Sequence, residues 1–228
     1  ILVTGGTGSG KSTTLASMIQ KISKEKNSHI ITIEDPIEYL YDHSNSIVNQ
    51  REVGSDTLSF SSALRSCLRQ DPDVVAIGEL RDIESMSAAI TIAETGHLVL
   101  GTLHTNNASG TITRLVDAFP PEKQNIIRTN LSMSLIAIIS QQLVPNNNNK
   151  RSLAMEILIN TPSIKALIRE NNIHQIDNYI LSGQKDGMVR MDDSLLSLYT
   201  NNMITKETAL SFAFNSIELE KRLSSQNI

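Results

Sequence analysis

Residues 5–12 combine glycines, a lysine and a hydroxyl side chain at spacings suited to holding phosphate groups. They read Gly-Gly-Thr-Gly-Ser-Gly-Lys-Ser and match G-x-x-x-x-G-K-[ST] at every fixed position. Glycine-rich backbone can curl around a triphosphate and point successive N–H groups inward. Lys11 would reach the β and γ phosphates, and Ser12 would join the shell of a Mg²⁺ ion. The motif therefore predicts binding of a nucleoside triphosphate.

The flanking sequence supplies the strand and the helix that this motif requires. Residues 1–3 are apolar, and Leu15, Met18, Ile19 and Ile22 follow the motif at helical spacing. The N-terminus of such a helix adds partial positive charge to the site. An ordinary flexible glycine loop is the alternative, and the Lys-Ser pair between strand and helix argues against it. The residues expected at the phosphates are Gly5, Gly6, Thr7, Gly8, Ser9, Gly10, Lys11, Ser12 and Thr13.

An acidic residue ends the apolar segment 74–77, which has the form of a strand leading to Glu79. Hydrolysis of a triphosphate needs one carboxylate near the metal and another to orient the attacking water. Glu79 is expected to face the metal, while Arg81 and Asp82 could pair with each other or with a neighbouring subunit. A strand that ends in an acidic residue is common in α/β proteins, so this assignment depends on the phosphate loop.

A second acidic segment presents Glu34, Asp35 and Glu38 within five residues, around a proline that stops the preceding strand. Clustered carboxylates repel one another unless a cation or a positive partner lies close by. A solvated acidic turn is the alternative to a metal or water site. The residues by themselves do not rank Glu34 and Glu38.

Two histidines, His97 and His104, stand seven residues apart and bracket the apolar segment 98–103. An odd spacing on a strand puts side chains on opposite faces, so we expect the pair at the two ends of a strand rather than on one metal. A lone histidine is usually structural. His104 comes where the strand runs toward the phosphates and is expected to sense the γ phosphate, whereas His97 is expected to pack or relay.

The alternation of apolar and amphipathic segments predicts an α/β fold with a mainly parallel sheet and helices on both faces. Antiparallel strands at one side and a helical subdomain at the C-terminus complete it. The expected strands are 1–4, 30–33, 74–77, 98–103, and an antiparallel pair 143–144 and 153–159. The expected helices lie near 12–24, 58–69, 82–94 and 106–117, with a long one from Pro121 through Leu135 and Ile138. From Pro162 the pattern is helical to the end.

Composition excludes several classes of protein. A chain of 228 residues with 39% hydrophobic residues can bury a core. Its one cysteine, Cys67, excludes an internal disulfide and a four-cysteine zinc site, and lies on an apolar helical stripe expected in the core. A net charge of −4 and the lack of tryptophan argue against a nucleic-acid partner. The longest apolar stretch, 135–139, is too short for a membrane span, so a cytoplasmic protein is expected.

These motifs together resemble the secretion and type IV pilus motor ATPases, and within that family the branch that drives pilus retraction and twitching motility. Four family boxes occur in order: Walker A at 5–13, the acidic box at 33–39, an atypical Walker B at 71–82 and the histidine box at 96–106. Further stretches similar to the retraction branch are 49–53, 140–145, 156–162 and 163–170.

The resemblance implies a RecA-like P-loop core over residues 1–160, a helical subdomain over 161–228, and ATP and Mg²⁺ as cofactors. It makes Glu38 the favoured water-activating base and Glu34 a supporting carboxylate, while the two histidines link nucleotide state to domain movement. The catalytic positions it implies are Glu38, Glu79, Lys11, Glu34, His97 and His104, with Ser12 and Glu79 on the metal.

The resemblance also implies partners. We expect a homo-oligomer, a hexamer in this family, at the cytoplasmic face of the inner membrane and in contact with the platform protein of a pilus machine. The chain opens at Ile1, directly on the first strand, and is expected to lack the family's N-terminal domain, whose arginines close the site from an adjoining subunit. Such a fragment would bind ATP well and hydrolyse it poorly. Gly6 stands where the family usually has proline, which should loosen the loop but keep its N–H donors.

The sequence leaves three alternatives to retraction. A pilus-assembly or type II secretion ATPase of the same family often carries a four-cysteine zinc insert, which this chain cannot build. A nucleic-acid translocase would share the core but conflicts with the acidic balance. A nucleotide-gated interaction module would bind ATP without turnover.

Overall fold

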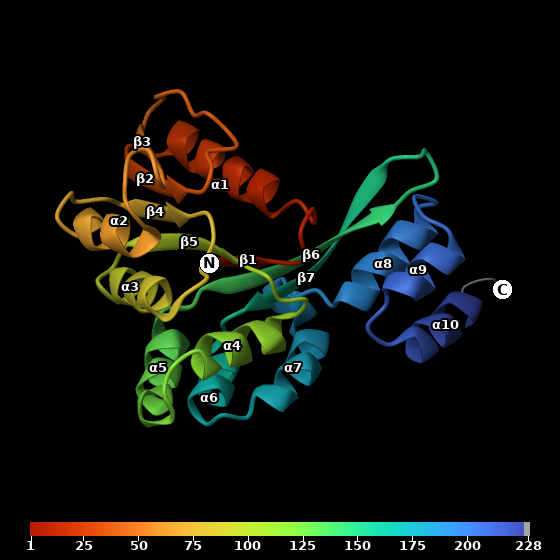
Figure 1. Ribbon diagram of the computed structural model, residues 1–228. Helices are drawn as coiled ribbons and strands as arrows, with labels where there is room; N and C mark the ends of the chain where they lie inside the picture. Colours follow the sequence, from red (N-terminus) through yellow and green to blue (C-terminus); the bar gives the residue numbers. More distant parts are fainter. Residues whose placement is uncertain (226–228) are drawn as a thin grey trace.

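A seven-stranded sheet runs through the centre of the computed structural model, which describes residues 1–225 (Figure 1). The strand order is β3-β2-β4-β5-β1-β6-β7, and every neighbouring pair is parallel except β6 and β7. The carboxyl ends of the parallel strands therefore meet at one edge of the sheet. The strands are β1 (Leu2–Thr4), β2 (His29–Glu34), β3 (Ile47–Glu52), β4 (Val74–Ile77), β5 (Leu98–Leu103), β6 (Ala137–Pro145) and β7 (Arg151–Ile159).

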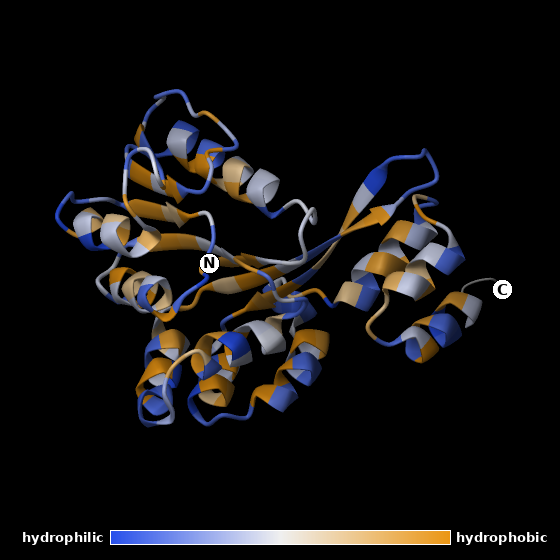
Figure 2. Ribbon diagram, in the orientation of Figure 1, coloured by the Kyte–Doolittle hydropathy of each residue, from blue (hydrophilic) through white to orange (hydrophobic). Residues whose placement is uncertain are grey.

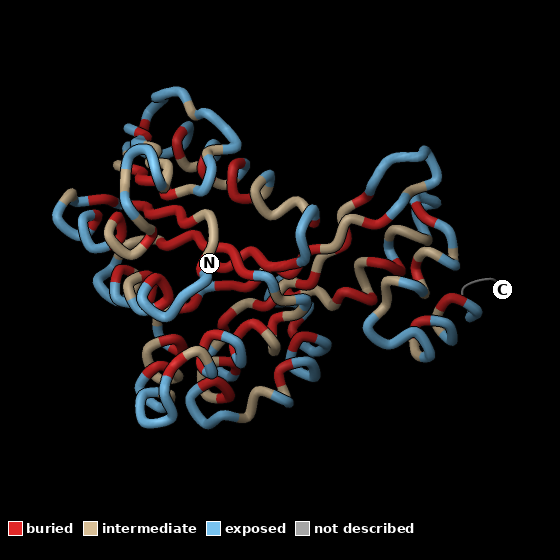
Figure 3. The backbone as a smooth tube through the Cα atoms, viewed as in Figure 1, coloured by how far each residue is buried: buried red, intermediate tan, exposed pale blue. Residues whose placement is uncertain are grey.

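Helices cover both faces of the sheet, as the sequence predicted. On one face α1 (Lys11–Glu25) packs Leu15 and Ile19 against Ile30 of β2, while Ile31 and Ile33 of that strand point into the larger core on the other face. Figure 2 shows the strands as mainly hydrophobic, and Figure 3 shows them as the most continuously buried part. The larger core is closed by α2 (Phe60–Cys67), α3 (Ile83–Glu94), α4 (Ala108–Asp117), α5 (Pro121–Ser134), α6 (Pro162–Arg169) and α7 (Ile176–Ser182). The fully buried Cys67 belongs to it, which confirms its expected place.

The β6–β7 hairpin extends beyond the other strands and carries a separate group of helices (Figure 1). Val144 and Ala154 of the hairpin share a second apolar core with these helices. The helices are α8 (Met191–Thr200), α9 (Lys206–Phe212) and α10 (Ser216–Ser225). Because α6 and α7 pack on the first core, the helices after residue 160 divide between two cores. The predicted domain boundary at 160/161 stays a prediction. Residues 226–228 of the predicted helical subdomain lie outside the described part of the chain.

Two expectations about the elements are wrong. The long helix does not continue through Leu135 and Ile138: α5 ends at Ser134, and Ile138 lies in β6, paired with Leu2 of β1. A short apolar run is compatible with either structure, and here pairing with the free side of β1 decides. The segment 143–144 is antiparallel to β7, as expected, but the strand is longer than predicted, because 143–144 is only the end of that nine-residue strand. Strand β3, at the sheet edge, was not predicted.

Among residues 1–225, no helix has both the length and the apolar character needed to cross a membrane.

Candidate nucleotide-binding site

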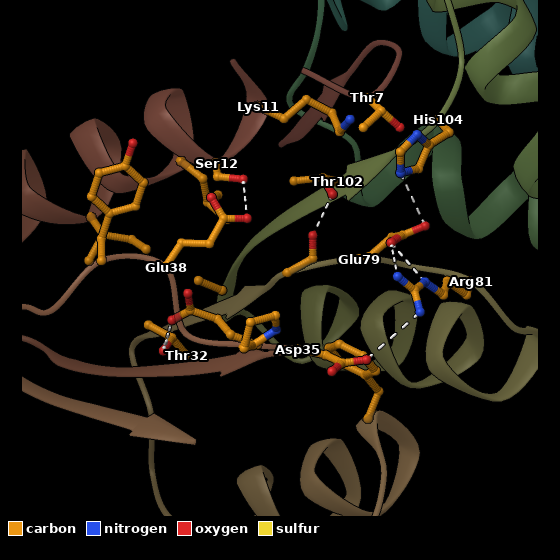
Figure 4. A pocket seen from close by; sticks show the side chains of 18 of the residues that line it. Thr7, Lys11, Ser12, Thr32, Asp35, Glu38, Glu79, Arg81, Thr102 and His104 are labelled. Carbon is orange, nitrogen blue, oxygen red and sulfur yellow. Dashed lines mark hydrogen bonds and ion pairs between the residues drawn. The ribbon is translucent and has the colours of Figure 1, made fainter. Parts of the chain in front are cut away.

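A polar cavity of about 300 Å³ opens at the carboxyl ends of β2, β4 and β5, between the glycine loop and the acidic segments (Figure 4). Its volume is at the lower end of the range for small-molecule sites. It brings together residues from five separate segments of the sequence. The predicted residues that line it are Thr7, Gly8, Lys11, Ser12, Glu34, Glu38, Glu79 and His104.

The glycine loop links β1 to α1 through backbone conformations that favour glycine. Gly5, Gly8 and Gly10 have φ angles of 145°, 75° and 90°. Gly10 precedes α1, and among the described residues no side chain caps the start of this helix. The first N–H groups of a helix lack intrahelical acceptors, so those of α1 remain available to an anion.

Lys11 brings the positive charge of this loop. Its Nζ donates to the carbonyl oxygens of Gly5 and Gly6 at 2.9 and 3.0 Å. Partial burial lowers the pKa of Lys11, while the nearby carboxylates of Glu79 and Glu38 act in the opposite direction. The ammonium is therefore held by weak backbone acceptors between two acids, and it can exchange those acceptors for phosphate oxygens.

The acidic segment separates the roles of Glu34 and Glu38. Glu38 reaches the glycine loop, because its Oε1 accepts a hydrogen bond from Ser12 Oγ at 3.1 Å. Glu34 instead accepts from Thr32 Oγ1 on its own strand at 2.6 Å. Glu38 thus contacts the hydroxyl that was predicted to hold the metal, whereas Glu34 lines the cavity from the side of the sheet.

Glu79 stands on the opposite side of the cavity, between a histidine and an arginine (Figure 4). Its Oε1 lies 3.3 Å from His104 Nε2, and its Oε2 accepts from Arg81 at 2.7 Å. Arg81 also lies 3.8 Å from Asp35. Arg81 and Asp82 do not pair with each other, because Asp82 caps α3 by accepting hydrogen bonds from the backbone N–H and the hydroxyl of Ser85. Their other expected role, pairing with a neighbouring subunit, stays a prediction.

The structure does not bring His97 to this cavity. The two histidines lie at opposite ends of β5, as their spacing predicted, and His97 Nδ1 lies 3.0 Å from both Thr95 Oγ1 and the Ile92 carbonyl oxygen. Its surroundings are those of a residue that packs at the end of α3. A relay role for His97 stays a prediction.

Two contributors to the site were not singled out from the sequence. Gln141 on β6 is only 2% exposed, and its Nε2 donates to Thr14 Oγ1 on α1 at 2.8 Å. Tyr41 lines the cavity, and burial followed by the charge of Glu34 raises the pKa of its phenol. The family-like stretch 140–145 includes Gln141 and was the one available signal for it; no signal pointed to Tyr41.

The cavity can neutralise a phosphate chain from one side and present acids from the other. Among residues 1–225, no cluster of three or more His, Cys, Asp or Glu side chains could hold a metal ion by itself. A Mg²⁺ ion commonly takes one or two protein ligands and completes its shell with substrate phosphates and waters. The donor set here, a serine hydroxyl and one carboxylate, suits that kind of site.

Several known proteins resemble this chain along most of its length. The profile of the family described as "Type II/IV secretion system protein" matches residues 1–205. The chain is 51% identical over 217 residues to the "Twitching motility protein" of Neisseria gonorrhoeae, covering 95% of this chain and 58% of that protein. It is 50% identical over 209 residues to the "Type IV pilus retractation ATPase PilT" of Pseudomonas aeruginosa, covering 92% and 61%. The chain thus spans about three fifths of the length of these curated relatives.

Among solved structures, the crystal structure of the "Pilus Retraction Motor PilT and Bound ADP" superimposes with a TM-score of 0.90 at 53% identity. The match covers 96% of this chain and 62% of that one. At this similarity the α/β core, the antiparallel edge and the C-terminal helices are common to both proteins.

Proposed function

The chain belongs to the type II/IV secretion system protein family, and on that premise we propose that it is the ATPase region of a motor that powers type IV pilus retraction. The observation that carries the proposal is that Lys11 of the glycine loop lines one cavity together with Glu38 and Glu79, whose charges act on its ammonium group. The names of the similar proteins support retraction and twitching motility as the process served.

In the proposed reaction, the loop amides and Lys11 hold the triphosphate of ATP. Water attacks the γ-phosphorus, the bond to the β–γ bridging oxygen breaks, and ADP and inorganic phosphate leave. Glu38 takes the proton of the water, and His104, beside Glu79, senses the γ phosphate. Ser12 and Glu79 would hold Mg²⁺, which when bound offsets charge on the phosphates.

The assembled state is part of the same proposal. A homohexamer at the cytoplasmic face of the inner membrane, in contact with the platform protein of the pilus machine, would turn hydrolysis into movement of one domain against the next. Arginines from the N-terminal domain of an adjoining subunit would complete each site. Helix α6 lies in the family stretch 163–170, and by analogy changes there would uncouple hydrolysis from retraction.

The residue assignments are tested by ATPase assays on the full-length protein, with ATP binding measured in parallel. Glu38→Gln and Glu79→Gln should each lower turnover at least about 100-fold, because general-base and electrostatic contributions are of that size, and should spare binding. Glu25→Gln, an exposed change on α1, is the matched control. Turnover at the wild-type rate in both active-site variants would reject the assignment.

Retraction is distinguished from the alternatives by deletion of the gene in a piliated cell. Loss of a retraction motor should leave surface pili and abolish twitching, whereas loss of an assembly or secretion ATPase should remove pili or export. ATP turnover per subunit that rises with protein concentration would support sites shared between subunits. Tight ATP binding without turnover in the assembled full-length protein would favour the interaction module.

A further inference from the structure

A buried carboxylate on β7, outside the cavity described above, is bonded to the first turn of α4. Glu156 is 5% exposed, and its Oε1 accepts the backbone N–H of Ala108 at 2.7 Å. Ala108 is the first residue of α4 and is fully buried. Burial of a carboxylate is costly unless it is hydrogen-bonded, and the start of a helix is a favourable place for negative charge. Glu156 therefore ties β7 to the beginning of α4.

The beginning of α4 in turn fixes the loop that carries His104. Residues 104–107 form the whole connection from β5 to α4, and His104 Nε2 lies 3.3 Å from Glu79. The loop is fastened to the first turn of the helix by two contacts. Thr105 Oγ1 lies 2.7 Å from Thr111 Oγ1, and Asn107 Oδ1 accepts the N–H of Gly110 at 2.9 Å. Displacement of the first turn of α4 would therefore displace His104.

On its other side, Glu156 stands where β7 is joined to the segment leading into the C-terminal helices. Ile157 and Val189 exchange two backbone hydrogen bonds of 2.8 and 3.0 Å, and Met155 N donates to Ser194 Oγ of α8 at 3.1 Å. Figure 1 shows α4 beneath the sheet near its β6–β7 edge, on the side from which the chain passes to α8. Glu156 thus links the first turn of α4, which follows the histidine loop, to the strand that carries the helical group.

A cavity of about 370 Å³ adjoins Glu156 and contains a second buried carboxylate that serves as an internal comparison. Asp192 of α8 is 8% exposed and accepts the N–H groups of Phe214 and Asn215, before α10, at 2.8 and 3.0 Å. The charged residues lining this cavity are Glu156, Asp177, Arg190, Asp192 and Glu218. Asp192 resembles Glu156 in burial and in bonding to backbone donors, but within the described part of the chain its hydrogen bonds go to residues 214–215 and not to α4 or the histidine loop.

We propose that Glu156 is a positioning residue of the nucleotide site, which holds the loop 104–107 so that His104 faces Glu79. It does not touch the nucleotide cavity and takes no part in bond making. The proposal rests on the proposed function for its kinetic consequence, but the anchoring itself is a structural property that can be measured without ATP turnover.

The test compares Glu156→Ala, Glu156→Gln and Asp192→Ala in the full-length protein by hydrogen–deuterium exchange. Loss of a buried hydrogen bond corresponds to roughly tenfold faster exchange, so Glu156→Ala should accelerate residues 104–111 by about that factor. Glutamine keeps an acceptor oxygen and should restore most of the protection. Asp192→Ala should accelerate residues 213–217 instead and leave 104–111 near the wild-type rate.

Steady-state kinetics give the second measurement. Glu156→Ala should lower kcat for ATP hydrolysis roughly five- to tenfold with KM little changed, because the glycine loop is untouched, and Glu156→Gln should recover it. Unchanged exchange at 104–111 in Glu156→Ala, or equal acceleration there in Asp192→Ala, would overturn the proposal. An inactive wild-type protein would instead reject the proposed function, while the exchange pattern would still decide whether Glu156 anchors the loop.

Discussion

The nucleotide cavity and the C-terminal helical group use polar side chains in opposite ways. In the cavity, Glu38 and Glu79 lie at the surface of an open space, and their partners are other side chains with a predicted role. In the helical group, Asp192 is occupied by two backbone donors. Asp193, in the same region, is bonded to both Arg190 and Arg222.

The difference extends to an unpaired buried group. The buried Ser9 Oγ of the glycine loop has no hydrogen-bond partner among residues 1–225. Unpaired buried polar groups lower stability, and one that persists calls for a functional explanation. The nucleotide cavity thus leaves donors and acceptors available to a ligand, whereas in the helical group they are hydrogen-bonded within the protein.

The largest expected effect on stability is at Gly5, the glycine of the loop that other atoms approach most closely. Its φ is 145°, and a Cβ there would collide with the Gln141 carbonyl oxygen and lie 2.5 Å from Ser9 Oγ. Gly5→Ala should lower the free energy of unfolding by roughly 4 kcal/mol, combining strain and overcrowding. Chemical denaturation measures the change.

The neighbouring Gly6 is the matched control for this substitution. A Cβ at Gly6 would meet no atom within 4 Å. Gly6→Ala should therefore change the free energy of unfolding by less than about 0.5 kcal/mol. Equal losses of stability at the two positions would show that close packing of Gly5 against β6 does not set the cost of a side chain in this loop.

Lys11→Ala tests whether a charged side chain of the cavity serves ligand binding, because it should weaken ATP binding without changing the stability of the fold. Charge-assisted hydrogen bonds contribute about 1.5–3 kcal/mol each, so ATP affinity should fall about 100-fold or more. The free energy of unfolding should change little, since the ammonium contacts only loop carbonyls. Calorimetric titration with ATP is the measurement, and Lys21→Ala on the exposed face of α1 is the control. Retained affinity would contradict the site.

The sequence predicted the cavity better than its supports, and particular residues show why. The glycine loop is recognisable because its chemistry depends on local spacing, and it made Glu79 a candidate at the end of a strand, whereas only the family resemblance ranked Glu38 above Glu34. Strand β3 was missed because the segment Ile47–Glu52 is largely polar, and its order comes from pairing with β2. Glu156 sits at an inward-facing position of β7, where alternation could have indicated burial, but its partner on α4 is set only by the tertiary fold.

Glu156 predicts a pH dependence of the stability of the fold. Burial, and then Asp177 and Asp192, raise the pKa of Glu156 from 4.5 to about 7, against the lowering effect of the Ala108 N–H. With the folded pKa above the unfolded one, this contribution is fully present below pH 4.5 and is lost as pH rises through 7. The loss is at most about 3 kcal/mol, at 1.36 kcal/mol per pKa unit.

Denaturation of the wild type and Glu156→Gln between pH 4.5 and 8 measures this dependence. The glutamine variant should lose less stability over that interval, so that it gains on the wild type as the pH rises. Glu94→Gln, an exposed change at the end of α3, should follow the wild type. Parallel curves for wild type and Glu156→Gln would mean that Glu156 does not hold its proton more tightly in the fold.

The smallest effects come from two arginines that pair with acids in the two regions. Arg222 donates to Asp193 at 2.7 Å, and Asp193 is only 16% exposed, so Arg222→Ala should lower the free energy of unfolding by about 1 kcal/mol. Arg81, 59% exposed beside Glu79, should contribute less than about 0.5 kcal/mol. Arg81→Ala should instead alter ATP turnover, because it frees an oxygen of Glu79, while Arg222→Ala should leave turnover unchanged. Thermal denaturation and ATPase assays on both variants would distinguish ion pairs that stabilise the fold from ion pairs that serve turnover. A loss of stability in Arg81→Ala equal to that in Arg222→Ala would mean that the ion pairs of the cavity also stabilise the fold.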